Sequence, residues 1–589
     1  MITRFGLINS IFSYLLNLQF DLSKEVNLYD VIIIGSGMFG SSLAAVLARN
    51  EAKVLLIDAG KHPRFAVGES TVRDTSKLLK ILSQRFDVPE LGNISSFVEI
   101  NENVSSNCGL KRNFGFAYHR SQQQQQQPKE VYQIVIPDHF EGPEIHFFRQ
   151  DIDHYLCQVA QKHGATVLEE TRITDINITS KEVTVETNSH EQFKGSYIVD
   201  ATGYRSVLAQ KFNLREETCR FKTHSRSIFT HMKGVKPYEE CKAGKSQVPR
   251  KWSQGTLHHC FDGGWIWVIP FNNTPDAHNP LTSVGLQLDS RKYPLVDTNP
   301  ETEWNRILSK FPSIAEQFEQ ATPAKPWIST GSRLQYSSSQ TIGERYCLAA
   351  HAAGFIEPLY SRGLPLSLNS LLLLADKLLL AIADEDFSTE RFKDVESYQQ
   401  KTLDNIDALV AGSYTSWRSY ELWNAWVRIW YACANLSTLH LQASYESYLQ
   451  NSNPQILTEA YSPNWGSFCP SLDSFQPFFA QAVEIIDAVE TGQMSSETAT
   501  SKLFFLIQNA DFLPPVFNLE KPEINNGGSF DANHLRSLAR WGNLLAPSEV
   551  KQKLFSGDAE ENLSRLEKEF EAFEHSDKYS SVRALLNNL

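Results

Sequence analysis

The chain has 589 residues, of which 41% are hydrophobic and 21% charged, and its formal net charge is −13. This length exceeds what one hydrophobic core usually supports, so we expect a globular protein of two to four domains. The acidic balance and the lack of a basic run exclude a nucleic-acid partner, because phosphate binding needs a concentrated basic face.

Eight cysteines are scattered through the chain without a CxxC pair. This spacing argues against a zinc site or a disulfide framework, so we expect no metal and a reducing, cytoplasmic location. Residues 1–28 are interpreted as an N-terminal extension whose apolar stretch is too short to span a bilayer. The apolar run from Leu371 to Ile382 contains Asp376 and Lys377 and is expected to form a buried amphipathic helix, so no membrane span is predicted.

A βαβ dinucleotide-binding pattern occupies residues 30–58. An apolar β-branched strand runs into the turn GSGMFG, a helical pattern follows, and a second apolar strand ends at Asp58. Gly35 allows the tight turn, Gly37 lets the backbone approach a pyrophosphate, and Gly40 lets the helix pack against the strand. Asp58 is placed to accept hydrogen bonds from an adenosine ribose. Because strand, turn, helix and acid agree, the pattern favours a cofactor site over a purely structural glycine turn.

The segment after this unit contains Arg64 within His-Pro-Arg. Near a nucleotide this arginine can contact phosphate or ribose, and a solvated surface arginine is the alternative. A helix is expected from Asp74 to Phe86, and residues 95–150 alternate as strands do. Six consecutive glutamines, Gln122 to Gln127, interrupt these strands, and their low complexity predicts a solvated, mobile loop tip.

Two later strands end in turns that suit a ligand. The buried strand from Tyr197 to Val199 runs into Asp200-Ala-Thr-Gly203, a glycine turn that can bring the backbone close to a ligand. The strand at 346–349 is followed by residues 350–363, where small side chains leave room for a bulky ring against the backbone.

Between residues 219 and 334 the pattern is mainly that of strands, and it includes the motif GWIWVIP. Alternation places Trp265 and Trp267 on one face of their strand. An aromatic cross-strand core is the alternative to a functional role for them. Beyond Ala383 the pattern is mainly helical.

The C-terminal helices carry a stripe of tryptophans. Trp423, Trp426 and Trp430 are spaced i, i+3 and i+7 and therefore share a helix face. Such a stripe is more often core than pocket, although apolar pockets do favour these residues. Both interpretations stay open.

Four motifs follow one another in a distinctive order: GSGMFG, GES after Pro-Arg, GWIWVIP and AAGFIEPLYSRG. With them the chain resembles the flavin-dependent halogenases, the tryptophan-halogenase-like branch of the flavoprotein monooxygenases with a p-hydroxybenzoate-hydroxylase-type fold. The resemblance covers about residues 29–440, and the remainder looks like a variable C-terminal extension. GWxWxIP is the specific motif, because the others occur throughout the wider monooxygenase group.

The resemblance implies an α/β fold in which a Rossmann-like FAD-binding domain is interleaved with a mainly antiparallel β-sheet substrate domain, followed by an α-helical C-terminal region. The FAD-binding domain is expected at 29–215 and 335–385, with 96–145 contributing to the substrate side. The substrate domain is expected at 216–334 and the helical region at 386–589.

The resemblance also assigns residues to the cofactor and the chemistry. FAD contacts are implied for Gly35, Gly37, Gly40, Asp58, Arg64, Asp200, Gly203, His351, Gly354 and Pro358. In the family, reduced FAD and O₂ convert a halide, chloride or bromide, into hypohalous acid, and a lysine directs this oxidant as a haloamine or by hydrogen bonding. Catalytic roles are implied for Lys111 as that lysine, for Ser361, and for Trp265 and Trp267, which hold substrate away from the flavin. Substrate contacts are expected from Tyr360, Trp423 and Trp426.

Three departures from the family pattern bear on these roles. His351 stands where the wider group has an aspartate near the ribityl chain, so flavin binding is expected to be weaker. Tyr360 replaces the glutamate of tryptophan-type members, which argues against free tryptophan as substrate. Arg362 has no counterpart in the family loop.

The leading functional hypothesis is a halogenase of secondary metabolism that acts on an electron-rich aromatic or otherwise activated substrate, free or carrier-bound. A flavin monooxygenase that hydroxylates or epoxidises is one alternative, and a flavoprotein without catalysis is another. Because no second dinucleotide fingerprint is present, electrons are expected to arrive as FADH₂ from a separate flavin reductase.

Overall fold

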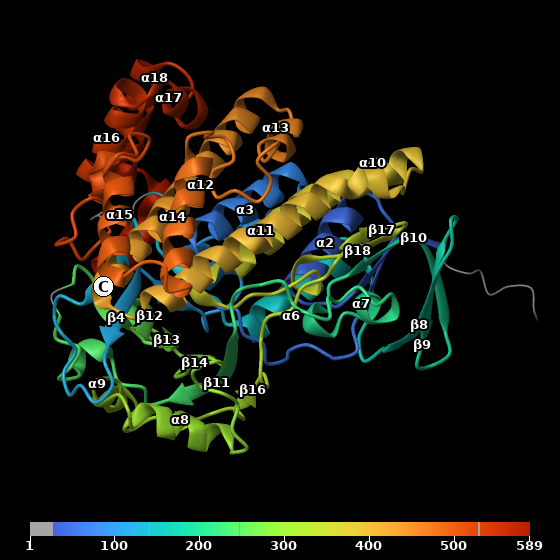
Figure 1. Cartoon of the computed structure of the whole chain (residues 1–589). Coiled ribbons are helices and arrows are strands. Elements are labelled where there is room, and N and C mark those ends of the chain that lie inside the picture. The colour runs from blue at the N-terminus through green and yellow to red at the C-terminus, as the bar shows by residue number, and fades with distance from the viewer. Residues whose placement is uncertain (1–27, 139, 141, 247, 528–530) are drawn as a thin grey trace, which may run out of the picture.

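The computed structural model describes residues 28–589 except 139, 141, 247 and 528–530. The proposed N-terminal extension therefore lies, but for its last residue, outside the described part of the chain. Two eight-stranded sheets form the centre of the molecule, with a large helical region packed beside them (Figure 1). The fold class expected from the sequence is confirmed.

The first sheet has the strand order β17-β18-β10-β1-β2-β7, in which every pair is parallel except β17 with β18, and β8 and β9 extend it as an antiparallel ribbon. β1 pairs in parallel with β2 and with β10, and β10 pairs in parallel with β18. The carboxyl ends of these four strands therefore meet at one edge of the sheet, where ligands bind in such folds. The strands are β1 (Leu28–Ile34), β2 (Val54–Ile57), β7 (Thr166–Leu168), β8 (Ile173–Ile178), β9 (Val183–Thr187), β10 (Gln192–Asp200), β17 (Ile342–Gly343) and β18 (Tyr346–Leu348).

The second sheet follows the order β15-β11-β14-β13-β12-β4-β5, with β16 also paired to β11. Its pairs are antiparallel except β4 with β12. Trp265 and Trp267 belong to the core cluster shared with the first sheet and the C-terminal helices, whereas Ile266 and Val268 belong to a second cluster on the opposite face, so the predicted alternation is confirmed. The strands are β4 (Asn113–His119), β5 (Val131–Val135), β11 (Ser225–Lys233), β12 (Gly255–Phe261), β13 (Gly264–Pro270), β14 (Thr282–Asp289), β15 (Thr322–Pro323) and β16 (Ile328–Ser329).

The mainly strand-forming character expected for residues 219–334 is confirmed by β11 to β16, whereas the expectation for the glutamine run needs correction. The segment from 219 to 334 also contains helices, α8 (Pro300–Leu308) and α9 (Pro312–Ala315), which Figure 1 shows below the second sheet. The glutamine run is not fully solvated, because Gln126 is only 4% exposed. Its side chain donates to the Glu130 carbonyl and accepts from Ser246, so specific hydrogen bonds hold this part of the loop.

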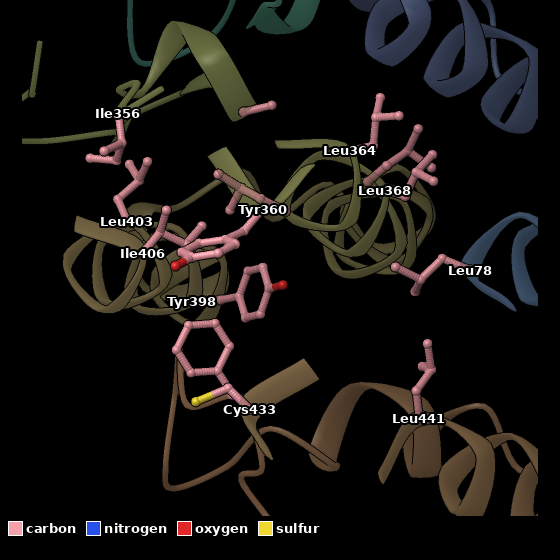
Figure 2. Close-up of a cluster of buried hydrophobic side chains, with 14 of the residues drawn as sticks. Leu78, Ile356, Tyr360, Leu364, Leu368, Tyr398, Leu403, Ile406, Cys433 and Leu441 are labelled. Carbon is pink, nitrogen blue, oxygen red and sulfur yellow. The ribbon is translucent and has the colours of Figure 1, made fainter. Parts of the chain in front are cut away.

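Long helices cover the first sheet and continue into the C-terminal region. Figure 2 shows side chains of α3, α10, α11 and α12 converging around Tyr360 and Tyr398. Among the described helices, one stretch, Leu359–Asp384, is long and apolar enough to cross a bilayer, and 67% of its most apolar window is buried inside the molecule. The helices named here are α2 (Met38–Arg49), α3 (Arg73–Arg85), α6 (Arg149–Lys162), α7 (Val207–Lys211), α10 (Gly363–Asp384), α11 (Thr389–Ser416), α12 (Tyr420–Asn451), α16 (Ala532–Arg540), α17 (Ser548–Leu554) and α18 (Ala559–His575).

The contact between α11 and α12 depends on the absence of a side chain at Gly412. A Cβ built there would lie 2.2 Å from the ring of Trp426. The indole N–H of Trp426 in turn donates to the Leu409 carbonyl at 3.0 Å. The indole therefore lies flat against the backbone of α11.

We expect Gly412→Val to lower the free energy of unfolding by about 1–3 kcal/mol, because the added methyl groups overpack a buried helix contact. Thermal or denaturant unfolding measures the change. Ala411→Val, one residue earlier on the partly exposed side of α11, is the matched control and should cost much less. Equal losses in the two variants would show that helix propensity, and not the Trp426 contact, decides the effect.

Candidate active site

The glycine turn after β1 is shaped for a phosphate. Gly35 has φ +100°, a left-handed conformation that favours glycine, and a Cβ at Gly40 would lie 1.9 Å from the Gly35 carbonyl oxygen. A Cβ at Gly37 would meet no atom within 4 Å. Gly37 is also the N-cap of α2, so free backbone N–H groups and the positive end of the helix dipole face this open space. The turn thus fits the pyrophosphate of a dinucleotide.

Asp58 lies beside this turn at the end of β2. Its carboxylate accepts from the backbone N–H and hydroxyl of Ser36, from the backbone N–H of Gly60 and from the Arg64 guanidinium. Burial opposes ionisation, but the bonds from Arg64, Ser36 and Gly60 hold the pKa of Asp58 well below its usual range. Arg64 is therefore an ion-pair partner of Asp58 and not a free surface arginine.

The turns after β10 and β18 complete the same edge of the sheet. The Asp200 carboxylate is used within its own turn, where it accepts from Thr202, Ser206 and the backbone N–H of Leu208. Gly203 follows with φ +70°, and a Cβ there would lie 4.0 Å from that of His351. Asp200 thus shapes the turn, and its neighbour Gly203 lies against the loop that carries His351.

His351 presents an unused nitrogen at this edge. Its Nε2 atom is buried and has no hydrogen-bond partner among the described residues, and burial next to Arg149 lowers the pKa of the ring to about 4. A Cβ at Gly363, the first residue of α10, would lie 3.0 Å from this nitrogen. The loop continues through Gly354 and Pro358. The unpaired nitrogen of His351 and the open space at Gly37 make this edge of the first sheet suitable for FAD.

A cavity of about 640 Å³ lies between α3, β5, α12 and the C-terminal helices. Its walls are mainly apolar and aromatic, and charged side chains cluster at one part of them. The wall residues used below are Arg73, Asp74, Lys111, Phe114, Glu144, Tyr360, Arg362, Trp430, Leu538 and Phe555. Of the predicted catalytic and substrate residues, the cavity includes Lys111 and Tyr360.

Lys111 ends the short strand β3 (Gly109–Lys111), which pairs with β6 (Glu144–His146). The Lys111 side chain is fully buried: its Nζ donates to the Thr71 carbonyl, lies 3.3 Å from a Glu144 oxygen and is 4.4 Å from the centre of the Phe114 ring. Burial lowers the pKa of Lys111 to about 8, against the opposing charge of Glu144. A buried amine that titrates near neutral pH is typical of catalytic lysines.

The tryptophans of GWIWVIP lie apart from this cavity. Trp265 donates to Glu357 at 3.0 Å and Trp267 to Ser283 at 3.2 Å. The rings of Trp265, His258 and Phe114 follow one another at centroid distances of 5.3 and 4.5 Å, so an aromatic row connects Trp265 to the neighbour of Lys111.

The C-terminal tryptophans separate into different environments. Trp430 lies on the cavity wall and stacks on Tyr360, with ring centroids 4.5 Å apart. Trp423 packs against Phe116 behind that wall, and Trp426 turns toward α11. The structure thus brings Trp430 to the cavity and leaves Trp423 and Trp426 in the core.

The loop before α10 is tightly wound and firmly held. Tyr360 and Ser361 both have positive φ, +70° and +53°, which is uncommon for residues with side chains and concentrates at functional sites. The Tyr360 hydroxyl is 2.6 Å from that of Ser413. Arg362 forms an ion pair with Asp74 at 2.9 Å, which ties the loop to α3. Ser361 lies between these two anchored residues.

Two carboxylates at the site, Glu357 and Glu144, were given no role from the sequence. Glu357 accepts hydrogen bonds from Ser225, Trp265 and Tyr414, and burial raises its pKa to about 7. Its place in the motif AAGFIEPLYSRG was a usable signal. Glu144 had no such signal, because the pairing of β3 with β6 brings it to Lys111 across a 33-residue separation.

Three side chains of metal-ligating type lie together near the nucleotide turn, although the cysteine spacing predicted no metal site. Ligand atoms of His62, Cys157 and Glu169 come within 4.8 Å of one another. Hydrogen bonds already engage part of this group, since His62 Nε2 contacts Ser36 and Glu169 accepts from the His62 backbone N–H. All eight cysteines are free thiols.

Comparison with known proteins adds an independent line of evidence. Residues 28–386 match the FAD binding domain family model. The chain is 42% identical to monodechloroaminopyrrolnitrin halogenase PrnC of Pseudomonas fluorescens, over 90% of this chain and 94% of that protein. It is 39% identical to tetracycline 7-halogenase of Kitasatospora aureofaciens, over 90% and 96% of the two chains.

The fold is shared with a solved halogenase. The crystal structure of PltM in complex with phloroglucinol and FAD superposes with a TM-score of 0.82 at 34% identity, covering 85% of this chain and all of PltM. Three observations indicate the same cofactor and family: the sheet edge that suits FAD, the matched FAD-binding region, and these relatives. The chain is an FAD-dependent oxidoreductase that uses a halide as cosubstrate, and it belongs to the flavin-dependent halogenases.

Proposed function

We propose that this enzyme halogenates an electron-rich aromatic compound in the 640 Å³ cavity and that Lys111 directs the oxidant there. The observation that carries the proposal is the fully buried amine of Lys111 at the wall of a mainly apolar cavity. FAD, when bound and reduced, supplies the electrons with which O₂ and a halide give hypohalous acid. The residues of this chain then have to receive, orient and release that oxidant.

The donors around Lys111 favour the ammonium form as the working state. An ammonium has three N–H donors. One is taken by the Thr71 carbonyl, a second faces Glu144, and the Phe114 ring stabilises the positive charge. We infer that the third donor holds the oxidant by hydrogen bonding, in preference to a haloamine on the neutral nitrogen.

We infer that the substrate is a free small aromatic compound and not a carrier-bound one. Residues of the C-terminal region, including Leu538 and Phe555, contribute to the walls of the cavity. The two relatives that cover 90% of this chain are named for monodechloroaminopyrrolnitrin and tetracycline, and PltM binds phloroglucinol. The carrier-protein-dependent pyrrole chlorinase of Pseudomonas fluorescens matches over only 64% of this chain. A panel of these three compounds, with chloride or bromide and product detection by mass spectrometry, tests the substrate class.

Electrons are proposed to come as FADH₂ from a separate flavin reductase in the cytoplasm. The sequence has one dinucleotide fingerprint, at residues 35–40, which leaves no second fingerprint for a nicotinamide dinucleotide. Activity that depends on added reductase and NAD(P)H supports this arrangement. Halogenation driven by NAD(P)H without a reductase would contradict it.

We expect Gly37→Val to fold normally and to lose FAD binding. A Cβ at this position meets no atom within 4 Å, and the branched side chain fills the space where the pyrophosphate approaches. Thermal unfolding and flavin absorbance after gel filtration measure the two properties. Gly40→Val is the contrasting variant and should damage folding itself, because its Cβ would overlap the Gly35 carbonyl. Normal FAD retention in Gly37→Val would remove the phosphate-turn assignment.

Lys111→Met should bind FAD and consume O₂ with FADH₂, yet give no halogenated product. Methionine keeps the length of the side chain and removes the amine, so oxidant formation and oxidant use are separated. FADH₂ oxidation, hypohalous acid trapped with monochlorodimedone, and halogenated product are scored on the same sample. Lys129→Met, on the surface, is the matched control. Undiminished halogenation in Lys111→Met would overturn the proposal.

Halogenated product per FADH₂ consumed should fall as the pH rises through about 8. The pKa of Lys111 is lowered to about 8 by burial, so its ammonium form is present below that pH and lost above it. Because hypochlorous and hypobromous acids titrate at different pH values, a midpoint shared by the chloride and bromide reactions belongs to the protein. Activity that rises through this pH would indicate a haloamine on neutral Lys111 instead.

A further inference from the structure

Glu144 is the carboxylate nearest to the amine of Lys111. The two residues are directly paired across the strands β3 and β6, and both are buried, Lys111 completely and Glu144 to 3% exposure. Resting on the function proposed above, we propose that Glu144 is a catalytic residue that accepts the proton which the aromatic ring loses when the halogen bonds to carbon.

The position of the Glu144 carboxylate suits this role. Its Oε1 atom lies 3.7 Å from Arg73 Nε on α3, and its Oε2 atom lies 3.3 Å from Lys111 Nζ. No aligned hydrogen bond reaches Oε2 from the described residues, so this oxygen keeps a free acceptor position. Because Glu144 also lines the cavity, a substrate ring and the lysine can share the same carboxylate.

The charges around Glu144 set its basicity. Burial raises the pKa of its carboxyl, Lys111 and Arg73 oppose that rise, and Asp74 on α3 adds to it. His146, two residues along β6, is neutral because burial lowers its pKa to about 3. A carboxylate that is more basic than usual, with a cation on each side, can take a proton and pass it on.

The step balances with the reactants already named. The carbon–halogen bond forms as the oxygen–halogen bond of hypohalous acid breaks, and the departing hydroxide takes a proton from the Lys111 ammonium to leave as water. The ring then loses its proton to Glu144, and its electron pair restores aromaticity. Glu144 returns that proton to Lys111 over the 3.3 Å contact. The sum is arene plus hypohalous acid giving halogenated arene plus water.

A substrate isotope effect tests the proton transfer itself. The probe is the panel compound with the highest turnover, carrying deuterium at the carbon that is halogenated. Wild-type enzyme should show no primary isotope effect on product formation. Glu144→Gln should lose about 100-fold or more in halogenation and gain a primary isotope effect, because ring deprotonation becomes limiting. FADH₂ oxidation and trapped hypohalous acid should stay at wild-type levels.

A second readout needs neither flavin nor substrate. Cyanate modifies only unprotonated amines, so the pH dependence of Lys111 carbamylation in FAD-free protein, followed by peptide mass spectrometry, reports the pKa of this lysine. The Glu144 charge raises that pKa. The midpoint should therefore move to lower pH in Glu144→Gln and stay unchanged in Glu303→Gln, where the removed carboxylate pairs with Arg226 in the other core.

Glu144→Asp is a second variant that keeps the negative charge and is used in case Glu144→Gln does not fold. It should retain partial halogenation, with a smaller isotope effect than Glu144→Gln. Wild-type halogenation in Glu144→Gln, or a rate loss without an isotope effect, would overturn the role of Glu144. An unmoved carbamylation midpoint would overturn its coupling to Lys111. If Lys111→Met still halogenates, the proposed function is wrong. If Lys111→Met loses halogenation while Glu144→Gln keeps full activity, only the proposal for Glu144 is wrong.

Discussion

The loop from Glu357 to Arg362 is the constraint on which the rest of the site depends. Glu357 bonds to the second sheet through Ser225 and Trp265 and to α11 through Tyr414. Further along, Tyr360 bonds to α11 and stacks on α12, and Arg362 pairs with Asp74 of α3. These six residues thus connect the second sheet to three long helices. The two consecutive positive φ values persist because these contacts over-determine the loop.

Burial of charge is the second physical theme of the site. Taking an ammonium or a carboxylate out of water is costly unless each is paired, and Lys111 and Glu144 satisfy that condition for each other. The same desolvation brings their pKa values toward one another, which makes proton exchange between them easy. Glu357, by contrast, accepts hydrogen bonds from three neutral donors among the described residues, and burial, with a smaller contribution from Asp289, raises its pKa to about 7. The site therefore contains two buried carboxylates in two different electrostatic settings.

Local sequence patterns were enough to predict much of the fold. The strand, glycine turn and helix of residues 30–58 each have a recognisable local pattern. The alternation of side chains along a strand predicted that Trp265 and Trp267 share one face. Contacts between residues that are far apart in the sequence could not be predicted from local patterns. Arg362 forms an ion pair with Asp74, which is 288 residues away in the sequence, and no local motif around either residue predicts this contact. The tryptophan stripe shows the limit within one helix, because the shared face of Trp423, Trp426 and Trp430 did not indicate which of them reaches the cavity.

The strand pair β3 and β6 has a consequence for how this enzyme can diversify. Backbone pairing fixes the spacing of Lys111 and Glu144, whereas many of the residues that decide the cavity's shape, such as Leu538 and Phe555, come from helices more than 390 positions later in the chain. Reactive groups and recognition surface are thus inherited from separate stretches of the gene. In the proposed mechanism, mutation can therefore remodel the far wall for a new aromatic scaffold while Lys111 and Glu144 stay paired.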